Sequence, residues 1–157
     1  MYTNISETRK ITLLYQGAAN AVACDVVSMT NFHHGAFVAV HTGSSDTDLT
    51  LSLYEATSVA AGTNQAITKT VPLYVDADAG TSSDTLVRQA DAYAYTIDTG
   101  VSANQVVVFE VDPSILSDGY DCVYLADSGG NASNVCTILF VGEPRYSGGS
   151  LPSAIVD

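Results

Sequence analysis

The sequence predicts an all-β protein, an antiparallel β-sandwich of jelly-roll or Greek-key type with an extended C-terminal arm. Apolar and polar residues alternate with a period of two in most segments, which is typical of strands that bury one face. Runs of Ser, Thr, Asn, Asp and Gly interrupt these segments every 10–20 residues, and such runs form turns. No segment shows the periodicity and caps of a long helix.

About nine strands are expected from this pattern. The first alternates Ile11, Leu13 and Tyr15 with Thr12, Leu14 and Gln16, and the clearest one places Leu49, Leu51 and Leu53 on one face. The other expected strands span residues 24–29, 36–41, 70–75, 92–97, 105–111, 121–125 and 135–141.

Two further patterns refine this prediction. The continuous apolar runs at 36–40, 106–109 and 138–141 indicate central strands that are covered on both faces. Asp112 followed by Pro113 predicts one helical turn, with Asp112 as the N-cap and Pro113 at the first helical position.

Composition limits the classes of function. The 157 residues fit one domain and include 17 acidic but only five basic residues, for a formal net charge of -12. Such a surface repels nucleic acid; it is a solubilising surface or, alternatively, one that attracts a basic protein. No apolar run reaches the length of a membrane span, and the polar segment 1–10 lacks the apolar core of a secretory signal.

Three cysteines, Cys24, Cys122 and Cys136, lie in strand-like segments without metal-binding spacing. We expect buried thiols in a reducing compartment, with a Cys122–Cys136 disulfide as the alternative.

Catalytic and metal-binding patterns are weak. His33, His34 and His41 read as structural or solvated, because His34 and His41 would face opposite ways along one strand. The 76–84 loop begins with Asp-Ala-Asp but lacks the full calcium pattern, which leaves a solvated loop or a weak cation site. The sequence contains no nucleophile elbow, phosphate loop or dinucleotide fingerprint. We therefore expect no enzyme, no catalytic residues, no cofactor and no metal.

Nine tyrosines are present without any tryptophan. Tyr93 and Tyr95 would share one strand face, and Tyr120 and Tyr124 another. Such rows pack at sheet edges or, alternatively, bind sugars or a partner protein.

Residues 143–157 are expected to form a C-terminal extended arm. Two prolines and two glycines in this stretch argue against a central strand or a helix, whereas its apolar tip is more than a solvated tail needs. We therefore expect an N-terminal arm at 1–8, a body at 9–142, and partner contacts through Tyr146, Leu151, Pro152, Ile155 and Val156.

Several short motifs occur in an order that resembles small capsid decoration (cement) proteins of tailed bacteriophages. They begin with Asn4-Ile-Ser-Glu7 and Cys24-Asp-Val-Val-Ser-Met-Thr-Asn-Phe-His33, and continue with Leu51-Ser-Leu-Tyr-Glu-Ala-Thr57 and Val108-Phe-Glu-Val-Asp112. Gly119-Tyr-Asp-Cys-Val123, Glu143-Pro-Arg-Tyr146 and Leu151-Pro-Ser-Ala-Ile-Val-Asp157 complete the series. Each motif is short, and the resemblance rests on their order along the chain.

The resemblance implies a structural virion protein on the outer surface of the phage head, made in the host cytoplasm. Such a protein binds the major capsid protein, bridges neighbouring capsid subunits and forms a trimer, without nucleic-acid or membrane partners. The alternatives are a carbohydrate- or receptor-binding sandwich of the virion, and a head-completion or tail component.

Overall fold

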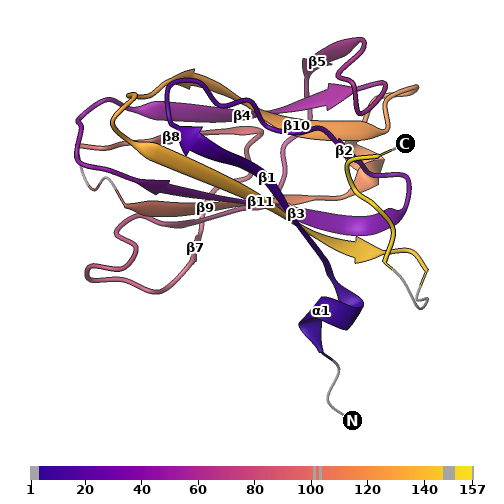
Figure 1. Ribbon diagram of the computed structural model, residues 1–157, viewed down its shortest axis with the longest axis horizontal. Helices are drawn as coiled ribbons and strands as arrows, with labels where there is room; N and C mark the ends of the chain where they lie inside the picture. Colours follow the sequence, from indigo (N-terminus) through magenta and orange to yellow (C-terminus); the bar gives the residue numbers. More distant parts are fainter. Residues whose placement is uncertain (1–3, 101, 103, 147–150, 157) are drawn as a thin grey trace.

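Two antiparallel sheets pack face to face in the computed structural model, which describes residues 4–100, 102, 104–146 and 151–156 (Figure 1). The larger sheet has the strand order β1-β11-β3-β9-β6-β7. Its strands are β1 (Lys10–Ala18), β3 (Phe32–Thr42), β6 (Leu73–Asp76), β7 (Val87–Arg88), β9 (Gln105–Val111) and β11 (Val135–Pro144).

The smaller sheet has the order β2-β10-β4-β5, and β8 pairs with β4 beside β5. Its strands are β2 (Val27–Ser28), β4 (Leu49–Ala56), β5 (Asn64–Ala66), β8 (Ala94–Ile97) and β10 (Cys122–Gly129). Two single helical turns, α1 (Ile5–Thr8) and η1 (Pro113–Ile115), complete the described elements. The prediction of an all-β antiparallel sandwich is therefore confirmed.

The strand order also bears on the type of sandwich. With β5, β6 and β7 set aside, eight strands remain; renumbered along the chain, they have the orders 1-8-3-6 and 2-7-4-5. In both sheets, strands from the first half of the chain alternate with strands from the second half. This order is compatible with the two Greek keys of a jelly roll.

Most strands lie where the alternation predicted them. β9 spans Gln105–Val111 as predicted, and Leu49, Leu51 and Leu53 of β4 are all fully buried. The predicted turn after Asp112 is η1, where the Asp112 side chain accepts a hydrogen bond from the Ser114 amide. The short strands β5 and β7 and the turn α1 were not predicted.

The core lies between the two sheets. Phe37, Phe109 and Phe140 from the larger sheet face β4 and β10, and all three rings are fully buried. Phe140 packs against Phe37 and against Phe32, with ring centroids 5.4 and 5.2 Å apart. This aromatic cluster fills the inner side of the larger sheet at the centre of the core.

β1 departs from simple alternation. Its register with β11 shifts between Leu13 and Tyr15, as at a β-bulge. Leu14 is buried and Tyr15 packs against the core, whereas Ile11 and Leu13 are each 52% exposed on the outer side. The alternation had placed Tyr15 on the same face as Ile11 and Leu13, and the bulge separates them.

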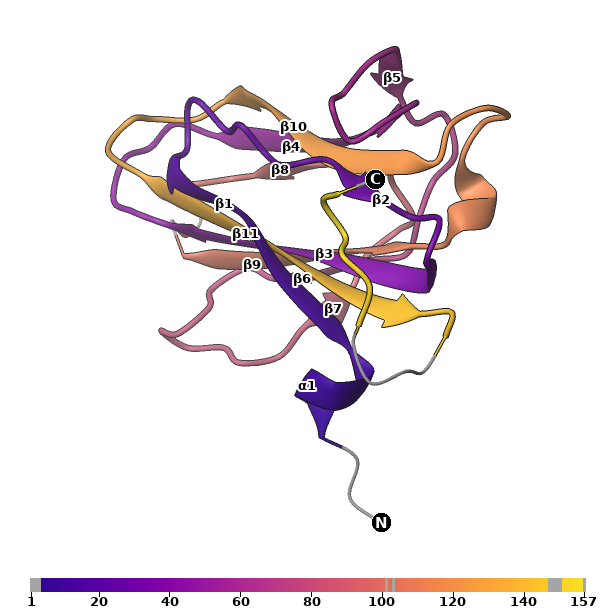
Figure 2. The ribbon, with the colours of Figure 1, turned by 45° about the vertical axis from the view of Figure 1, so that its right-hand side comes forward.

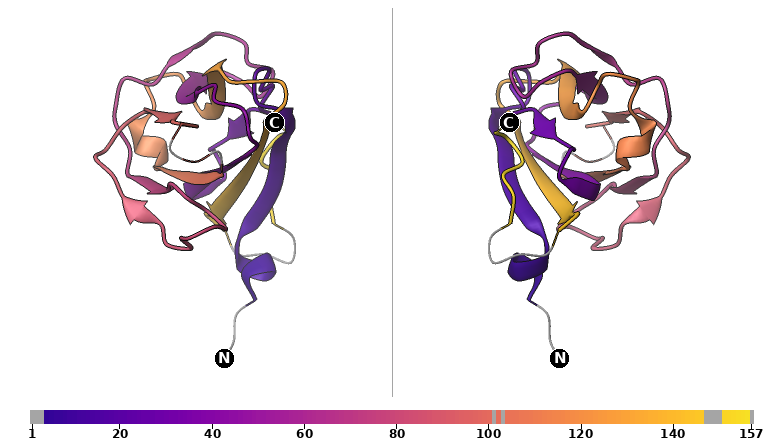
Figure 3. Two further views of the ribbon diagram at one scale, coloured as in Figure 1. Left: turned by 90° about the vertical axis from the view of Figure 1, so that its left-hand side faces the viewer. Right: turned by 90° about the vertical axis from the view of Figure 1, so that its right-hand side faces the viewer.

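The three apolar runs do form central strands, each with a neighbour on both sides. However, the prediction that they are covered on both faces is wrong for β3 and β11, whereas Val108 of β9 is buried on its outer side. Viewed from its ends in Figure 3, the molecule has two layers, and no described helix or strand lies over the outer face of the larger sheet. Val38, Val40 and Leu139 are only partly buried there.

Candidate functional site: the C-terminal segment

The chain leaves β11 at Pro144 and is held at once by Arg145. The Arg145 amide donates to the Asn31 carbonyl at 2.8 Å, and its Nε donates to the Phe32 carbonyl at 2.9 Å. Tyr146 follows this clamp and is 77% exposed. A ring that follows a fixed backbone but has little cover is available for contact with another molecule.

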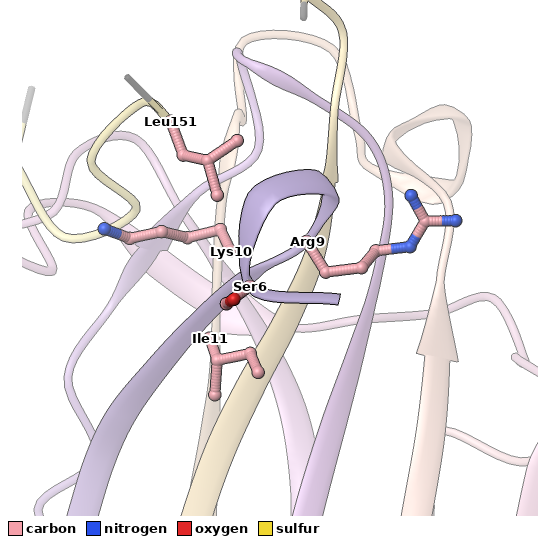
Figure 4. Close-up of a pocket in the computed structure, with 5 residues that line it drawn as sticks. All are labelled: Ser6, Arg9, Lys10, Ile11 and Leu151. Atoms are coloured by element: carbon pink, nitrogen blue, oxygen red, sulfur yellow. The ribbon is translucent and has the colours of Figure 1, made fainter. Parts of the chain in front are cut away.

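Leu151 and Pro152 are both partly buried against the body. Leu151 lies above the start of β1, where it lines a hollow with Ser6, Arg9, Lys10 and Ile11 (Figure 4). Lys10 and Arg9 extend to opposite sides of this hollow, and Arg9 pairs with Glu143 at 3.4 Å. Leu151 also lines a neighbouring hollow with Glu7 of α1 and with Glu143 and Pro144 of β11, so it lies between α1 and the end of β11.

Ala154 anchors the segment. Its side chain is fully buried in the main core, and its carbonyl accepts a hydrogen bond of 2.8 Å from the Ser28 amide of β2. Figure 2 shows residues 151–156 running beside β1 toward β2. These strands are the edges of the two sheets, so Ala154 closes the sandwich at the seam between them.

Ile155 and Val156 follow the anchor but point away from it. Ile155 is 37% exposed and Val156 is 65% exposed. Because Ala154 fixes the backbone, these two side chains are presented at a defined place on the surface.

The five predicted contact residues therefore differ in their surroundings. Tyr146, Ile155 and Val156 are exposed, whereas Leu151 and Pro152 already contact the protein's own body. The expected arm start at residue 143 also shifts, because Glu143 and Pro144 belong to β11. In the proposed N-terminal arm, Ile5–Thr8 form a helical turn, and residues 1–3 lie outside the described part.

Ala154 was not identified from the sequence as the residue that anchors the C-terminal segment. A single alanine in a Pro- and Ser-containing stretch has no periodic partners, so no sequence signal marks it as buried. Leu151, Ile155 and Val156 drew attention because they are large.

The histidines do not assemble a site. His34 is partly exposed and its Nε2 lies 3.2 Å from Glu110 Oε2, whereas His41 is fully buried on the opposite face of β3. In the described part of the chain, no group of three or more His, Cys, Asp or Glu side chains could hold a metal ion.

The 76–84 loop is organised by side-chain hydrogen bonds within the loop and from Ser102. Asp76 accepts a hydrogen bond from the Asp78 amide, and Asp78 accepts from the hydroxyls of Ser82 and Ser102. These bonds engage the carboxylates of Asp76 and Asp78 with the protein itself.

The three cysteines are free thiols. Burial raises the pKa of Cys24 and of Cys136 to about 12, so both remain protonated and unreactive near neutral pH. Cys122 belongs to a separate small cluster with Val26 and Ala56, and the alternative disulfide with Cys136 is not formed.

The tyrosines do not form the predicted rows. Tyr124 pairs with Tyr54 across β4 and β10, with ring centroids 5.6 Å apart. The Tyr124 hydroxyl donates a hydrogen bond to Oδ1 of Asn64. Tyr120 instead lies beside Met29, Leu116 and Arg145 in a hollow below η1. Tyr93 is 43% exposed, whereas Tyr95 packs against the core.

Among the described elements, neither helical turn is long or apolar enough to cross a bilayer.

Comparisons with known proteins give few matches. No family model and no curated protein matches the sequence. Among solved structures, the fold is similar to the SPBc2 prophage-derived protein YomS, with 10% sequence identity and a TM-score of 0.45. The similarity covers 85% of this chain and 91% of that one. At this level, the likeness concerns only the general course of the chain.

Proposed function

We propose that the chain is a structural protein of a bacteriophage virion, which binds the outside of the head and bridges neighbouring capsid subunits. The observation that carries this proposal is the anchored C-terminal segment. Ala154 is fully buried, and the two residues that follow it are apolar and exposed. A rigid two-layer body that presents apolar side chains from a fixed edge suits a clamp between subunits.

Two other observations support the proposal. The order of motifs along the chain resembles that of capsid decoration proteins. Jelly-roll sandwiches also occur in viral capsid and lectin domains, although this support is an analogy at the level of the fold. Many weak contacts on one lattice add up through multivalency, so each apolar contact needs to contribute only modestly.

The test uses heads purified from particles that lack this protein. Ile155→Asp and Val156→Asp are added separately, and bound copies are counted after sedimentation. We expect each variant to bind at least about tenfold more weakly, because a charge replaces a desolvated apolar contact. Tyr93 is exposed and lies immediately before β8. Tyr93→Asp therefore adds the same charge at a distant place, and this control should bind like the wild type.

Deleting residues 147–157 is a poorer test, because it also removes Ala154 from the core. Wild-type binding by both single variants would contradict the proposed role of the segment. The number of copies per virion gives an independent measurement, since decoration of a lattice requires hundreds and a head-completion or tail component only a few.

One observation favours the carbohydrate-binding alternative. The Tyr54–Tyr124 pair and the Asn64 amide lie together on the smaller sheet, and an aromatic pair beside a polar group can bind a sugar ring. A glycan array would support this alternative if binding is reproducible and is lost in Tyr124→Ala.

A further inference from the structure

The outer face of the larger sheet is apolar, and no helix or strand in the described part of the chain lies over it. We define the outer apolar face by six side chains from three adjacent strands: Ile11, Leu13, Val38, Val40, Leu139 and Val141. Ile11 and Leu13 are 52% exposed, and the other four are partly buried.

The register shows that this face is continuous. Leu13 pairs with Leu139 and Leu139 with Val38, so one apolar row crosses three strands and ends beside the buried Val108 of β9. Cross-strand partners share one face of a sheet.

The rows on either side continue the face. Ile11 pairs with Val141, which pairs with Ala36. On the other side, Val40 lies between Thr137 and Val106. Strands with one solvated face normally place polar residues there, so this composition requires an explanation beyond folding.

We propose that this face is where two copies of the chain associate, sheet against sheet. This inference does not depend on the proposed function. The pairing is two-fold, and it therefore differs from the trimer that the family resemblance implies.

The charges at the border of the face favour a second copy as the occupant. Glu110 lies 3.2 Å from His34, and Arg9 lies 3.4 Å from Glu143. These contacts form within one copy, so the groups that they join are not free to bind a strongly charged partner. A neutral apolar surface of this kind is complementary to itself about a two-fold axis.

The size of the face fits a weak dimer. Three strands about 4.8 Å apart and three rows about 6.8 Å apart span about 300 Å² per copy. The accessible surface of side chains exceeds this projected area, so two copies would bury on the order of 1,000 Å², near the lower limit for specific interfaces. We therefore expect association in the micromolar range.

Sedimentation velocity from about 1 to 200 μM tests the proposal, in the absence of capsids, on the wild type and two variants. Leu13→Lys and Leu13→Glu are chosen because the exposed edge position should tolerate either residue without unfolding. Both should raise the dimer dissociation constant at least about tenfold, since each removes one apolar anchor from each copy. Because Lys and Glu change the net charge in opposite directions, an effect that both variants share comes from the lost apolar contact and not from the change in net charge.

Tyr93→Lys and Tyr93→Glu are the matched controls on the opposite sheet and should associate like the wild type. Circular dichroism and thermal unfolding verify that all variants are folded. A wild type that is monomeric at 200 μM overturns the proposal. So does a dimer or trimer that is insensitive to both Leu13 substitutions, because its interface would then lie elsewhere.

The result is independent of the capsid-binding test. Loss of association in the Leu13 variants with normal binding of Ile155→Asp to heads would support this interface and contradict the proposed role of the C-terminal segment. Conversely, normal association of the Leu13 variants with weakened binding of Ile155→Asp to heads would contradict this interface and support the proposed role of the C-terminal segment.

Discussion

Glu55, near the end of β4, is a fully buried carboxylate that is held by its neighbours. Its Oε1 accepts from Gln65 Nε2 at 2.6 Å, and its Oε2 accepts from the Ser117 amide at 2.8 Å. These bonds tie β4 to β5 and to the turn before β10. Burial raises the pKa of Glu55, but the hydrogen bonds from Gln65 and Ser117 and the charge of Lys69 outweigh it, so the pKa is lowered.

This lowered pKa predicts a specific pH dependence of stability. Because the folded state prefers the ionised carboxylate, its contribution is fully present above the unfolded pKa of about 4.3 and is lost as the pH falls through the folded value. Glu55→Gln should cost on the order of 1.5–3 kcal/mol at pH 7. Urea unfolding of both proteins between pH 7 and 3 measures the difference, which should shrink below about pH 4. A difference that stays constant over this range would contradict the assignment.

Gly130 and Gly119 offer a second residue-scale comparison. Both have positive φ, at 78° and 82°, but a Cβ on Gly130 would lie 2.2 Å from the Ala19 carbonyl oxygen, whereas nothing lies within 4 Å of one on Gly119. Gly119→Ala should therefore cost about 1 kcal/mol from backbone strain alone. Gly130→Ala should cost clearly more, as measured by denaturant unfolding, because backbone must also move. Equal losses would show that the turn at Gly130 adapts freely.

At the scale of elements, the C-terminal segment acts as a strap over the seam between β1 and β2. Ala154→Asp would place a charge in the core, which is unfavourable enough to release the strap. The Ser28 amide, which donates to the Ala154 carbonyl, should then lose its protection against hydrogen exchange. Amides of β9 at the centre of the other sheet should remain protected. Ile155→Asp is the neighbouring control and should leave Ser28 protected; loss of protection there as well would show that the strap is not anchored at Ala154.

The elements that could be predicted from sequence are those whose pattern follows from burial. β4 and β9 have long apolar alternation or an apolar run, and both occur as expected. β5 and β7 were missed because they are two or three exposed residues long, which leaves no periodic signal. The bulge in β1 was missed because it is a property of pairing with β11 and not of β1 alone.

The candidate site was predictable only in part, for a related reason. Large apolar residues near the C-terminus indicated an interacting segment, but the sequence did not show that the first partner is the protein's own body. Leu151 meets α1 and β1, and Ala154 meets the core. Both contacts depend on the edges of two sheets coming together, which local patterns do not encode.

At the scale of the whole molecule, charge and apolar surface are separated. The formal charge of -12 resides on loops and strand ends, whereas the centre of the larger sheet's outer face is aliphatic. Acidic loops keep the chain soluble and oppose random association. Contact through the centre of the sheet keeps most of the like charges of two copies apart. Because salt screens the repulsion that remains, added salt should strengthen the association of the two copies.

The same charge predicts how salt affects the folded monomer. Self-repulsion among the acids disfavours the compact state, and raising NaCl from about 0.01 to 0.15 M shortens the screening length from about 30 to 8 Å. The melting temperature should therefore rise by a few degrees and then level off, when measured at low micromolar concentration on the Leu13→Lys variant to avoid association. Neutralising two exposed acids, with Asp46→Asn and Asp118→Asn, should raise the melting temperature at low salt and reduce its salt dependence. A melting temperature that falls with NaCl would instead mean that ion pairs such as Arg9–Glu143 outweigh the repulsion.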